Sequence, residues 1–205
     1  MILQTNFIKF LGITVDNTLS WKQHIKLKKA CYVIRRSKLY LSNDVLKMVY
    51  FAFFHSVMSY GLIFGGNSTK SKCVFKLQKR AIRIIMAARN NDSCTEFFKT
   101  LKILPLFSQY IYTPLMFVVN NINLFLDNAK LYTIKTRNSY NLYPPLSHLT
   151  KYQKGVHYAG IRVFNHFPTS IKSIANETKE FKNTLKRFLL DNSFYSMDEF
   201  FNYKE

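Results

Sequence analysis

The sequence predicts a mainly α-helical protein. Only 6 Gly and 5 Pro occur in its 205 residues, which is few for an all-β chain that must make many tight turns. Hydrophobic residues make up 48% of the chain and charged residues 20%, a composition typical of globular rather than disordered proteins. In several segments, apolar residues recur at the three-to-four spacing of a helix face. A chain of this length can bury one full core or two small ones.

The first 66 residues predict a short β element followed by two helices. Phe7 to Val15 has the pattern of a strand pair, or of a strand and a turn. A helix capped near residues 18–20 then runs through a basic cluster at residues 35–38. The next helix, over residues 45–60, is apolar nearly all round, so we expect it in the centre of the core. We expect Gly61 and the stretch Gly65-Gly66-Asn67-Ser68 to break it. Its aromatic row should be buried: Tyr50, Phe51, Phe53 and Phe54.

Residues 70–89 predict an amphipathic helix with a basic face. The apolar residues line one side, and no acidic residue lies between Asp44 and Asp92. A helix that only needed solubility would usually mix Glu with Lys, so a face of one sign favours a phosphate-bearing partner. An ordinary solvated helix surface is the alternative. The basic residues of this helix include Lys72, Lys76, Lys79, Arg80 and Arg83.

The second half predicts helices on either side of an extended connection. A mostly apolar helix over residues 107–126 should bend or restart near Pro114. Residues 128–154 have no helical period and contain Tyr143-Pro144-Pro145, so we expect an extended polar linker. A closing helix follows, and the tail over residues 192–205 is expected to be frayed. The predicted parts are a β element at 1–17, a helical domain at 18–127, the linker at 128–154 and a C-terminal subdomain at 155–205.

The positive charge is concentrated in the first half of the chain. The formal net charge is +19, and residues 17–91 hold 15 Lys or Arg against a single acid, Asp44. Residues 177–205, in contrast, hold 5 basic and 6 acidic side chains. We therefore expect the surface that binds a polyanion in the first half of the chain.

The cysteines and the hydropathy pattern indicate an intracellular protein without a membrane span. Cys31, Cys73 and Cys94 are odd in number and far apart, which excludes a disulfide framework and fits a reducing compartment, cytoplasmic or nuclear. No signal peptide is apparent at the N-terminus. The most apolar window, residues 48–66, is interrupted by polar side chains and falls short of the ~20 residues that a span requires.

The acidic residues are too scattered to predict a catalytic centre. Nucleotidyl transfer needs two or three carboxylates close enough to share Mg²⁺ ions. The only adjacent pair, Asp198-Glu199, lies in the tail, where a solvated-charge interpretation is favoured. The five histidines show no metal-ligand spacing, and the chain contains no P-loop. We therefore expect no catalytic residue, metal site or cofactor in this chain.

Several sequence blocks, taken in order, resemble the region that follows the catalytic palm in jockey-type reverse transcriptases of non-LTR retrotransposons. The resemblance extends from residue 7 to about residue 190. Single blocks are weak, but their order and spacing together are fairly specific. The blocks are Phe10-Leu11-Gly12-Ile13-Thr14-Val15-Asp16 with Leu19-Ser20-Trp21, Tyr50 to Gly66, Gln78-Lys79-Arg80-Ala81-Ile82-Arg83-Ile84-Ile85, Phe98 to Pro105, and Tyr158 to Lys172.

The resemblance implies a fragment of an RNA-directed DNA polymerase that contributes binding rather than catalysis. The catalytic Tyr/Phe-x-Asp-Asp turn of these enzymes lies upstream of the Phe-Leu-Gly element at which this chain begins. Residues 1–17 would then be the primer-grip-like edge of the palm, and the helical domain would be thumb-like. Mg²⁺ would belong to the full-length enzyme, and the palm and fingers of the same polyprotein would be partners together with an RNA/DNA duplex.

The resemblance also implies roles for particular residues. Phe10, Leu11 and Gly12 would approach the primer end, although a plain tight turn is the alternative for Gly12. Lys76, Lys79, Arg80 and Arg83 would contact phosphates without reading sequence. The second-rank candidates are Lys28, Lys29, Arg35, Arg36 and Lys38.

Two other classes of function remain open from the sequence. The chain could be a stand-alone helical interaction protein that binds an acidic partner or an anionic membrane through the same basic face. It could also belong to an active enzyme whose carboxylates another chain or upstream sequence supplies.

Overall fold

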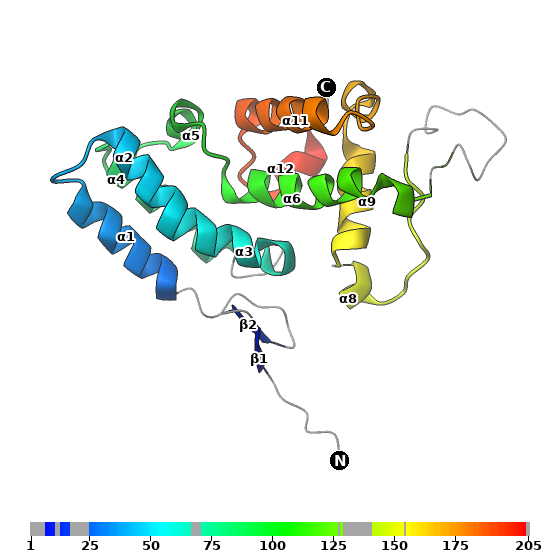
Figure 1. The fold of residues 1–205 in the computed structure, drawn as a ribbon, viewed down its shortest axis with the longest axis horizontal. Helices are drawn as coiled ribbons and strands as arrows, with labels where there is room; N and C mark the ends of the chain where they lie inside the picture. The colour runs from blue at the N-terminus through cyan, green and yellow to red at the C-terminus, as the bar shows by residue number, and fades with distance from the viewer. Residues whose placement is uncertain are drawn as a thin grey trace, which may run out of the picture. The chain divides into compact units, whose positions relative to one another are not determined.

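The structure is a computed structural model that describes residues 7–10, 13–16, 25–66, 71–126, 128, 141–153 and 155–203. The described part is mainly helical, as predicted (Figure 1). The chain divides into two compact units, Met1–Leu106 and Phe107–Glu205. This division lies inside the segment 18–127 that we expected to be one domain. It falls directly after Leu104-Pro105, where the non-helical residues 103–105 separate two helices.

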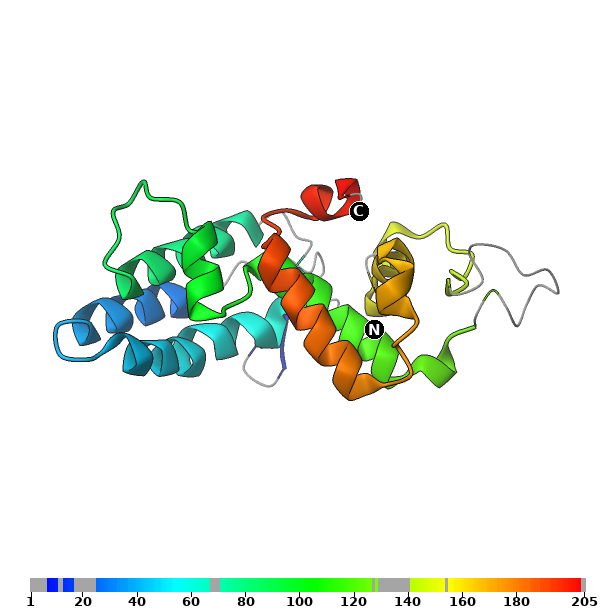
Figure 2. The same ribbon diagram turned by 90° about the horizontal axis from the view of Figure 1, so that it is seen from above.

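Unit 1 consists of a strand pair and a group of helices. The strands pair antiparallel, with Phe7 opposite Asp16 and Phe10 opposite Ile13. In Figures 1 and 2, α1 runs alongside both α4 and the rod made of α2, η1 and α3, and these elements are in contact. The elements are β1 Phe7–Phe10, β2 Ile13–Asp16, α1 Ile25–Ser37, α2 Asn43–Val49, the π-helix η1 Tyr50–His55, α3 Ser56–Gly65, α4 Ser71–Ile85 and α5 Thr95–Leu101.

The rod of α2, η1 and α3 buries one residue in every four. In an α-helix a step of four residues exceeds one turn by about 40°, so a stripe with this period would wind around the helix. The wider π-turn, closed by i→i+5 hydrogen bonds, takes up more residues per turn and compensates for part of this drift. The five stripe residues are all fully buried: Leu46, Tyr50, Phe54, Met58 and Leu62.

Two predictions about this rod were wrong. Phe51 and Phe53 are 39% and 54% exposed, because the four-residue stripe places them off the buried side. Gly61 does not break the helix, which continues to Gly65. The hydrophobic surroundings of the stripe outweigh the modest helix cost of one glycine.

The basic helix α4 lies where it was predicted but is shorter than residues 70–89. It ends at Ile85, and two residues later Ala87 adopts a left-handed conformation with φ of 54°. Lys38, from the turn after α1, donates a hydrogen bond of 2.6 Å to the carbonyl oxygen of Ile85. A lysine at this position satisfies a helix-end carbonyl and complements the negative end of the helix dipole.

Unit 2 contains the remaining helices. In Figures 1 and 2, α11 crosses α6 in an adjacent layer, and α9 runs across α6. The helix α6 continues through Pro114, so the predicted restart there does not occur. The elements are α6 Leu106–Asn120, the 3-10 helix η2 Ile122–Leu124, α8 Thr150–Gln153, α9 Val156–His166, α10 Thr169–Lys172, α11 Thr178–Asn192 and α12 Met197–Asn202.

The crossing of α9 and α6 depends on a glycine. A Cβ atom added at Gly160 would lie 2.7 Å from Cγ2 of Val118 and 3.3 Å from the carbonyl oxygen of Pro114. The first distance is shorter than real Cβ contacts allow, and neither the valine methyl nor the backbone oxygen can move freely. Gly160 therefore permits the close approach of the two helices.

The described part of the predicted linker is attached to unit 2. Residues 141–149 are extended as expected, but Thr150–Gln153 form the helix α8, so the prediction of an extended segment was wrong there. The amide of Tyr143 donates to the carbonyl oxygen of Leu126 at 2.8 Å. The side-chain amide of Asn165 in α9 bonds to both the N–H and the carbonyl oxygen of Leu142, each at 2.8 Å, and Leu142 is buried. Residues 129–140 of the predicted linker lie outside the described residues.

The prediction of a frayed tail was wrong. Phe194 and Phe200 are only 2% and 1% exposed, in an aromatic cluster that also contains Phe167 and Phe188. The hydroxyl oxygen of Ser196 caps α12 by accepting from the amide of Glu199 at 3.0 Å. The burial of large aromatic side chains outweighs the tendency of a chain end to be disordered. 

Candidate nucleic-acid interface

Gln78 is the first residue of the family-like block in α4, residues 78–85, and its side chain is fully buried. Its Nε2 donates to the hydroxyl oxygen of Tyr50 and to the carbonyl oxygen of Leu104, each at 3.0 Å. Its Oε1 accepts from the amide of Leu106 at 2.8 Å. Gln78 thus joins α4, η1 and the segment after α5, and its role in this block is to hold the fold.

Arg83 is also engaged in a contact within unit 1. Its Nε and Nη2 donate to the carbonyl oxygen of Asp92 at 3.0 and 2.8 Å. This two-armed contact fastens the turn after α4 onto the helix. We therefore remove Arg83 from the leading candidates for phosphate contact.

The other basic side chains of α4 differ in their surroundings. The ammonium of Lys79 lies 4.9 Å from the ring centroid of Phe75, and its side chain is half-buried. Lys76 and Arg80 are exposed. The second-rank candidate Lys38 donates to Ile85 as described above, and burial lowers its pKa below the ordinary lysine value.

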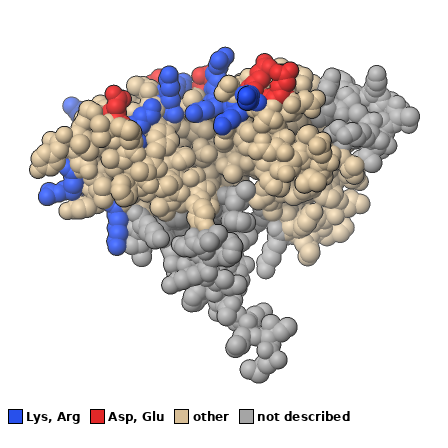
Figure 3. All heavy atoms as spheres, in the orientation of Figure 1, with Lys and Arg blue, Asp and Glu red and all other residues tan. Residues whose placement is uncertain are grey.

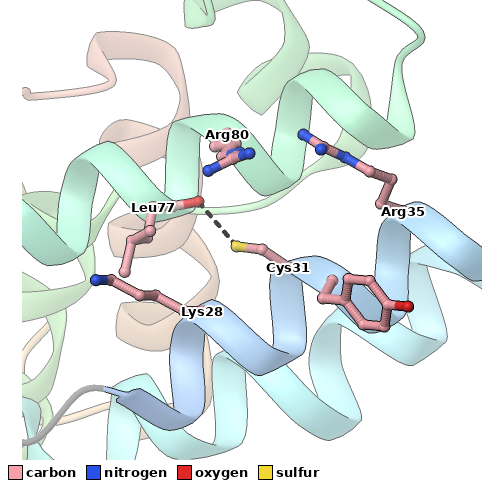
Figure 4. A pocket seen from close by; sticks show the side chains of 6 residues that line it. Lys28, Cys31, Arg35, Leu77 and Arg80 are labelled. Atoms are coloured by element: carbon pink, nitrogen blue, oxygen red, sulfur yellow. Dashed lines mark hydrogen bonds between the residues drawn. The ribbon is translucent and has the colours of Figure 1, made fainter.

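A hollow of about 150 Å³ lies between α1 and α4. Figure 4 shows Arg35, from the last turn of α1, and Arg80, from α4, pointing toward one another across it. Lys28 lies beneath Leu77 on the other side of Cys31. The lining consists of Lys28, Cys31, Tyr32, Arg35, Leu77 and Arg80, and we call this place the α1–α4 hollow.

The charged side chains that line the hollow are all positive. Within the described residues, neither Arg35 nor Arg80 forms an ion pair with a carboxylate. The thiol of Cys31, which donates to the carbonyl oxygen of Leu77 at 3.5 Å, is too buried to supply a negative charge. Burial raises the pKa of Cys31 to about 11, although Arg80 and Arg35 oppose this shift. The hollow is therefore a positive site without an internal counter-ion.

The sequence predicts each of these cations as a candidate but does not bring them together. Lys28, Cys31 or Tyr32, and Arg35 recur at i, i+3 or i+4, and i+7 on α1, a spacing that places them on one face. This periodicity could have shown the residues that α1 contributes to the hollow. The contribution of Arg80 depends on how α1 packs against α4, which the spacing within one helix does not encode.

The remaining candidates are spread more widely. Lys29 and Arg36 are exposed on α1 but do not line the hollow. On the face shown in Figure 3, Lys and Arg side chains are dispersed among other residues rather than joined in one patch. Phe10 is the last residue of β1, whereas Leu11 and Gly12 lie outside the described residues.

Metal ligands and membrane-spanning helices are two other features of interest. Among the described residues, no three His, Cys, Asp or Glu side chains are grouped so that they could hold a metal ion. In the same part of the chain, no single helix is long and apolar enough to cross a membrane, and the bent pair α5 and α6 meets the length and composition criteria only when taken together.

Comparison of this chain with protein-family models, with curated proteins and with solved structures gives no match. The resemblance to reverse transcriptases therefore depends on the residue blocks quoted above.

Proposed function

We propose that this chain is the thumb and flanking part of an RNA-directed DNA polymerase of the non-LTR retrotransposon type. Its role is to hold the RNA–DNA duplex, while an upstream palm and fingers, with Mg²⁺, supply the chemistry. The β1–β2 pair would be the palm-edge element and unit 1 the thumb-like bundle. The proposal draws on the order of the sequence blocks and on the cations of α1 and α4.

One observation carries the binding role. Arg35 and Arg80 point toward one another from two packed helices, and within the described residues neither is paired with a carboxylate. Two like charges that line one hollow repel each other, and an anion bound between them relieves this repulsion. Guanidinium groups match phosphate oxygens well because they present several donors in a planar fork. The exposed Lys76 on α4, with Lys28, Lys29 and Arg36 on α1, would extend the contacts along a phosphate backbone.

The test is the salt dependence of binding to a labelled blunt RNA–DNA hybrid, measured by fluorescence anisotropy with the whole chain. Lys76→Ala with Arg80→Ala should weaken binding and reduce the slope of log K against log salt by about 0.9 for each lost contact. The control with equal charge change is Lys179→Ala with Lys182→Ala, two exposed positions on α11. An unchanged slope in the first variant, or an equal change in the control, would overturn the proposal.

The same protein should be titrated with anionic lipid vesicles. The alternative function, a stand-alone helical protein that binds an acidic partner or an anionic membrane, predicts tighter binding to vesicles than to the hybrid. That outcome would replace the polymerase proposal.

A further inference from the structure

The α1–α4 hollow is too small to take a double helix but large enough for a small anionic group. Its volume of about 150 Å³ is well above the roughly 10–15 Å³ that a single water molecule needs. Its floor contains the apolar side chain of Leu77 and the neutral thiol of Cys31. A ligand that fills it must combine negative charge with a part that tolerates apolar surroundings.

An aromatic side chain, that of Tyr32, lies next to the charged groups of the hollow. Tyr32 lines the hollow, yet its side chain is 63% exposed, so it is not used to fill the core. An exposed ring next to guanidinium groups is the combination with which proteins hold single-stranded nucleic acid, because cations contact the phosphate and the ring stacks on a base. Bases within a duplex are already stacked on their neighbours and are not free to take up this ring.

We propose that the α1–α4 hollow binds one unpaired nucleotide, with its phosphate between Arg35 and Arg80 and its base stacked on Tyr32. This inference rests on the proposed function and deepens it, since it specifies the form of nucleic acid that the hollow itself takes beside the duplex. Such a site would favour a single-stranded template or an overhang over a blunt duplex. Lys28, on the other side of Cys31, would contact a neighbouring phosphate.

The experiment compares two labelled probes of equal length and identical sequence in one strand: a single-stranded RNA and a blunt RNA–DNA hybrid. Tyr32→Ala should weaken binding of the single strand about tenfold and leave the hybrid unchanged. Tyr32→Phe, which keeps the ring, should bind the single strand as the unaltered chain does. Tyr40→Ala is the matched control, because Tyr40 is 86% exposed and does not line the hollow.

The second part of the experiment tests the two arginines with the double variant Arg35→Gln and Arg80→Gln. This variant should reduce the salt slope for the single strand by about 0.7 for each lost contact. The control for Arg35→Gln is Arg36→Gln, the neighbouring exposed arginine outside the hollow, which should leave the preference for the single strand intact. All the substituted side chains are exposed, so each variant should retain the helical circular dichroism and the melting temperature of the unaltered chain.

The outcomes separate this inference from the proposed function. If the hybrid binds with a steep salt dependence but Tyr32→Ala and Tyr40→Ala affect the single strand equally, the nucleotide site is wrong and the duplex-binding proposal stands. If neither probe binds, both proposals fail. If Arg35→Gln with Arg80→Gln reduces binding to vesicles that carry phosphorylated inositol lipids but not to RNA, the hollow is a lipid-headgroup site and the inference is overturned.

Discussion

The Nε2 of Gln78 donates a hydrogen bond of 3.0 Å to the hydroxyl oxygen of Tyr50, and both side chains are fully buried. Burial raises the pKa of the Tyr50 hydroxyl well above its usual range, with the bond to Gln78 opposing the shift. The pair joins the π-turn of the rod to α4. The first residue of the family-like block on α4 is thus explained by contacts inside unit 1.

Gln78→Ala should strongly destabilise the chain. The substitution leaves the Tyr50 hydroxyl, the carbonyl of Leu104 and the amide of Leu106 without their partner in a buried site. We expect a loss of about 2–4 kcal/mol in the free energy of unfolding, measured by urea denaturation. Lys76→Ala, on the exposed side of the same helix, is the control and should change it by less than about 0.5 kcal/mol. Equal effects from the two variants would contradict this account of Gln78.

Arg83→Lys should separate folding from binding. The charge is kept, but lysine cannot reproduce the two-armed contact with the carbonyl of Asp92. We expect a loss of about 1 kcal/mol in the free energy of unfolding and an unchanged affinity for an RNA–DNA hybrid. Arg80→Lys should show the reverse, with unchanged stability and weaker binding. A fall in affinity for Arg83→Lys without a fall in stability would return Arg83 to the binding surface.

Gly160→Ala should destabilise unit 2. The added methyl group would lie 2.7 Å from Cγ2 of Val118, so α9 and α6 must separate. Overpacking of this kind costs about 1–3 kcal/mol. In a double-mutant cycle, Val118→Ala should recover part of the loss by removing the opposing methyl groups. Strictly additive effects of the two substitutions would show that the clash is relieved in another way.

The three cysteines should differ in reactivity toward a thiol reagent at pH 8. Cys73 is exposed, whereas Cys31 and Cys94 are buried and burial raises the pKa of each. One thiol should react quickly in the folded protein and three in denaturant. Cys73→Ser should abolish the fast phase. A fast phase that survives this substitution would mean that a buried thiol opens to solvent.

Cys31 also predicts a loss of stability at alkaline pH. Its pKa is about 11 in the folded chain, against an ordinary value of 9.0. Between these values the unfolded chain releases a proton that the folded chain keeps, so stability falls as the pH rises through this window. Urea denaturation at a series of pH values should show a smaller decline for Cys31→Ala than for the unaltered chain. Equal declines would assign the effect to other groups.

The elements that a local pattern can specify were predicted best. The amphipathic period of α4 comes from neighbouring residues, and this helix forms close to its predicted position. The buried stripe of the rod was predicted wrongly because a segment that is apolar all round does not indicate which of its sides faces the core. Only the contacts of the folded chain bury Tyr50 and Phe54 rather than Phe51 and Phe53. The tail was misjudged for the opposite reason, since Phe200 packs against Phe167, which lies far away in the sequence.

The candidate site shows the same division. Every basic side chain of the candidate site could be identified from the sequence, because a lack of acidic residues is visible without knowledge of the fold. The sequence does not distinguish Arg83, which holds a turn in place, from Arg80, which is exposed at the hollow. The two residues are three positions apart and chemically identical. That distinction comes from a single carbonyl oxygen, that of Asp92, which lies within reach of only one of them.

The π-turn at residues 50–55 has a consequence for how the length of this chain can vary. A π-turn holds one residue more than the α-turn it replaces, so it marks a position at which a residue could be lost without breaking the backbone hydrogen-bonded path. Such a deletion would return the segment to a regular α-turn and leave Met58 and Leu62 close to the side that Leu46 faces. The wide turn therefore keeps the two ends of the rod in phase, and a regular α-helix over the same residues would turn the buried residues of α3 away from the interior.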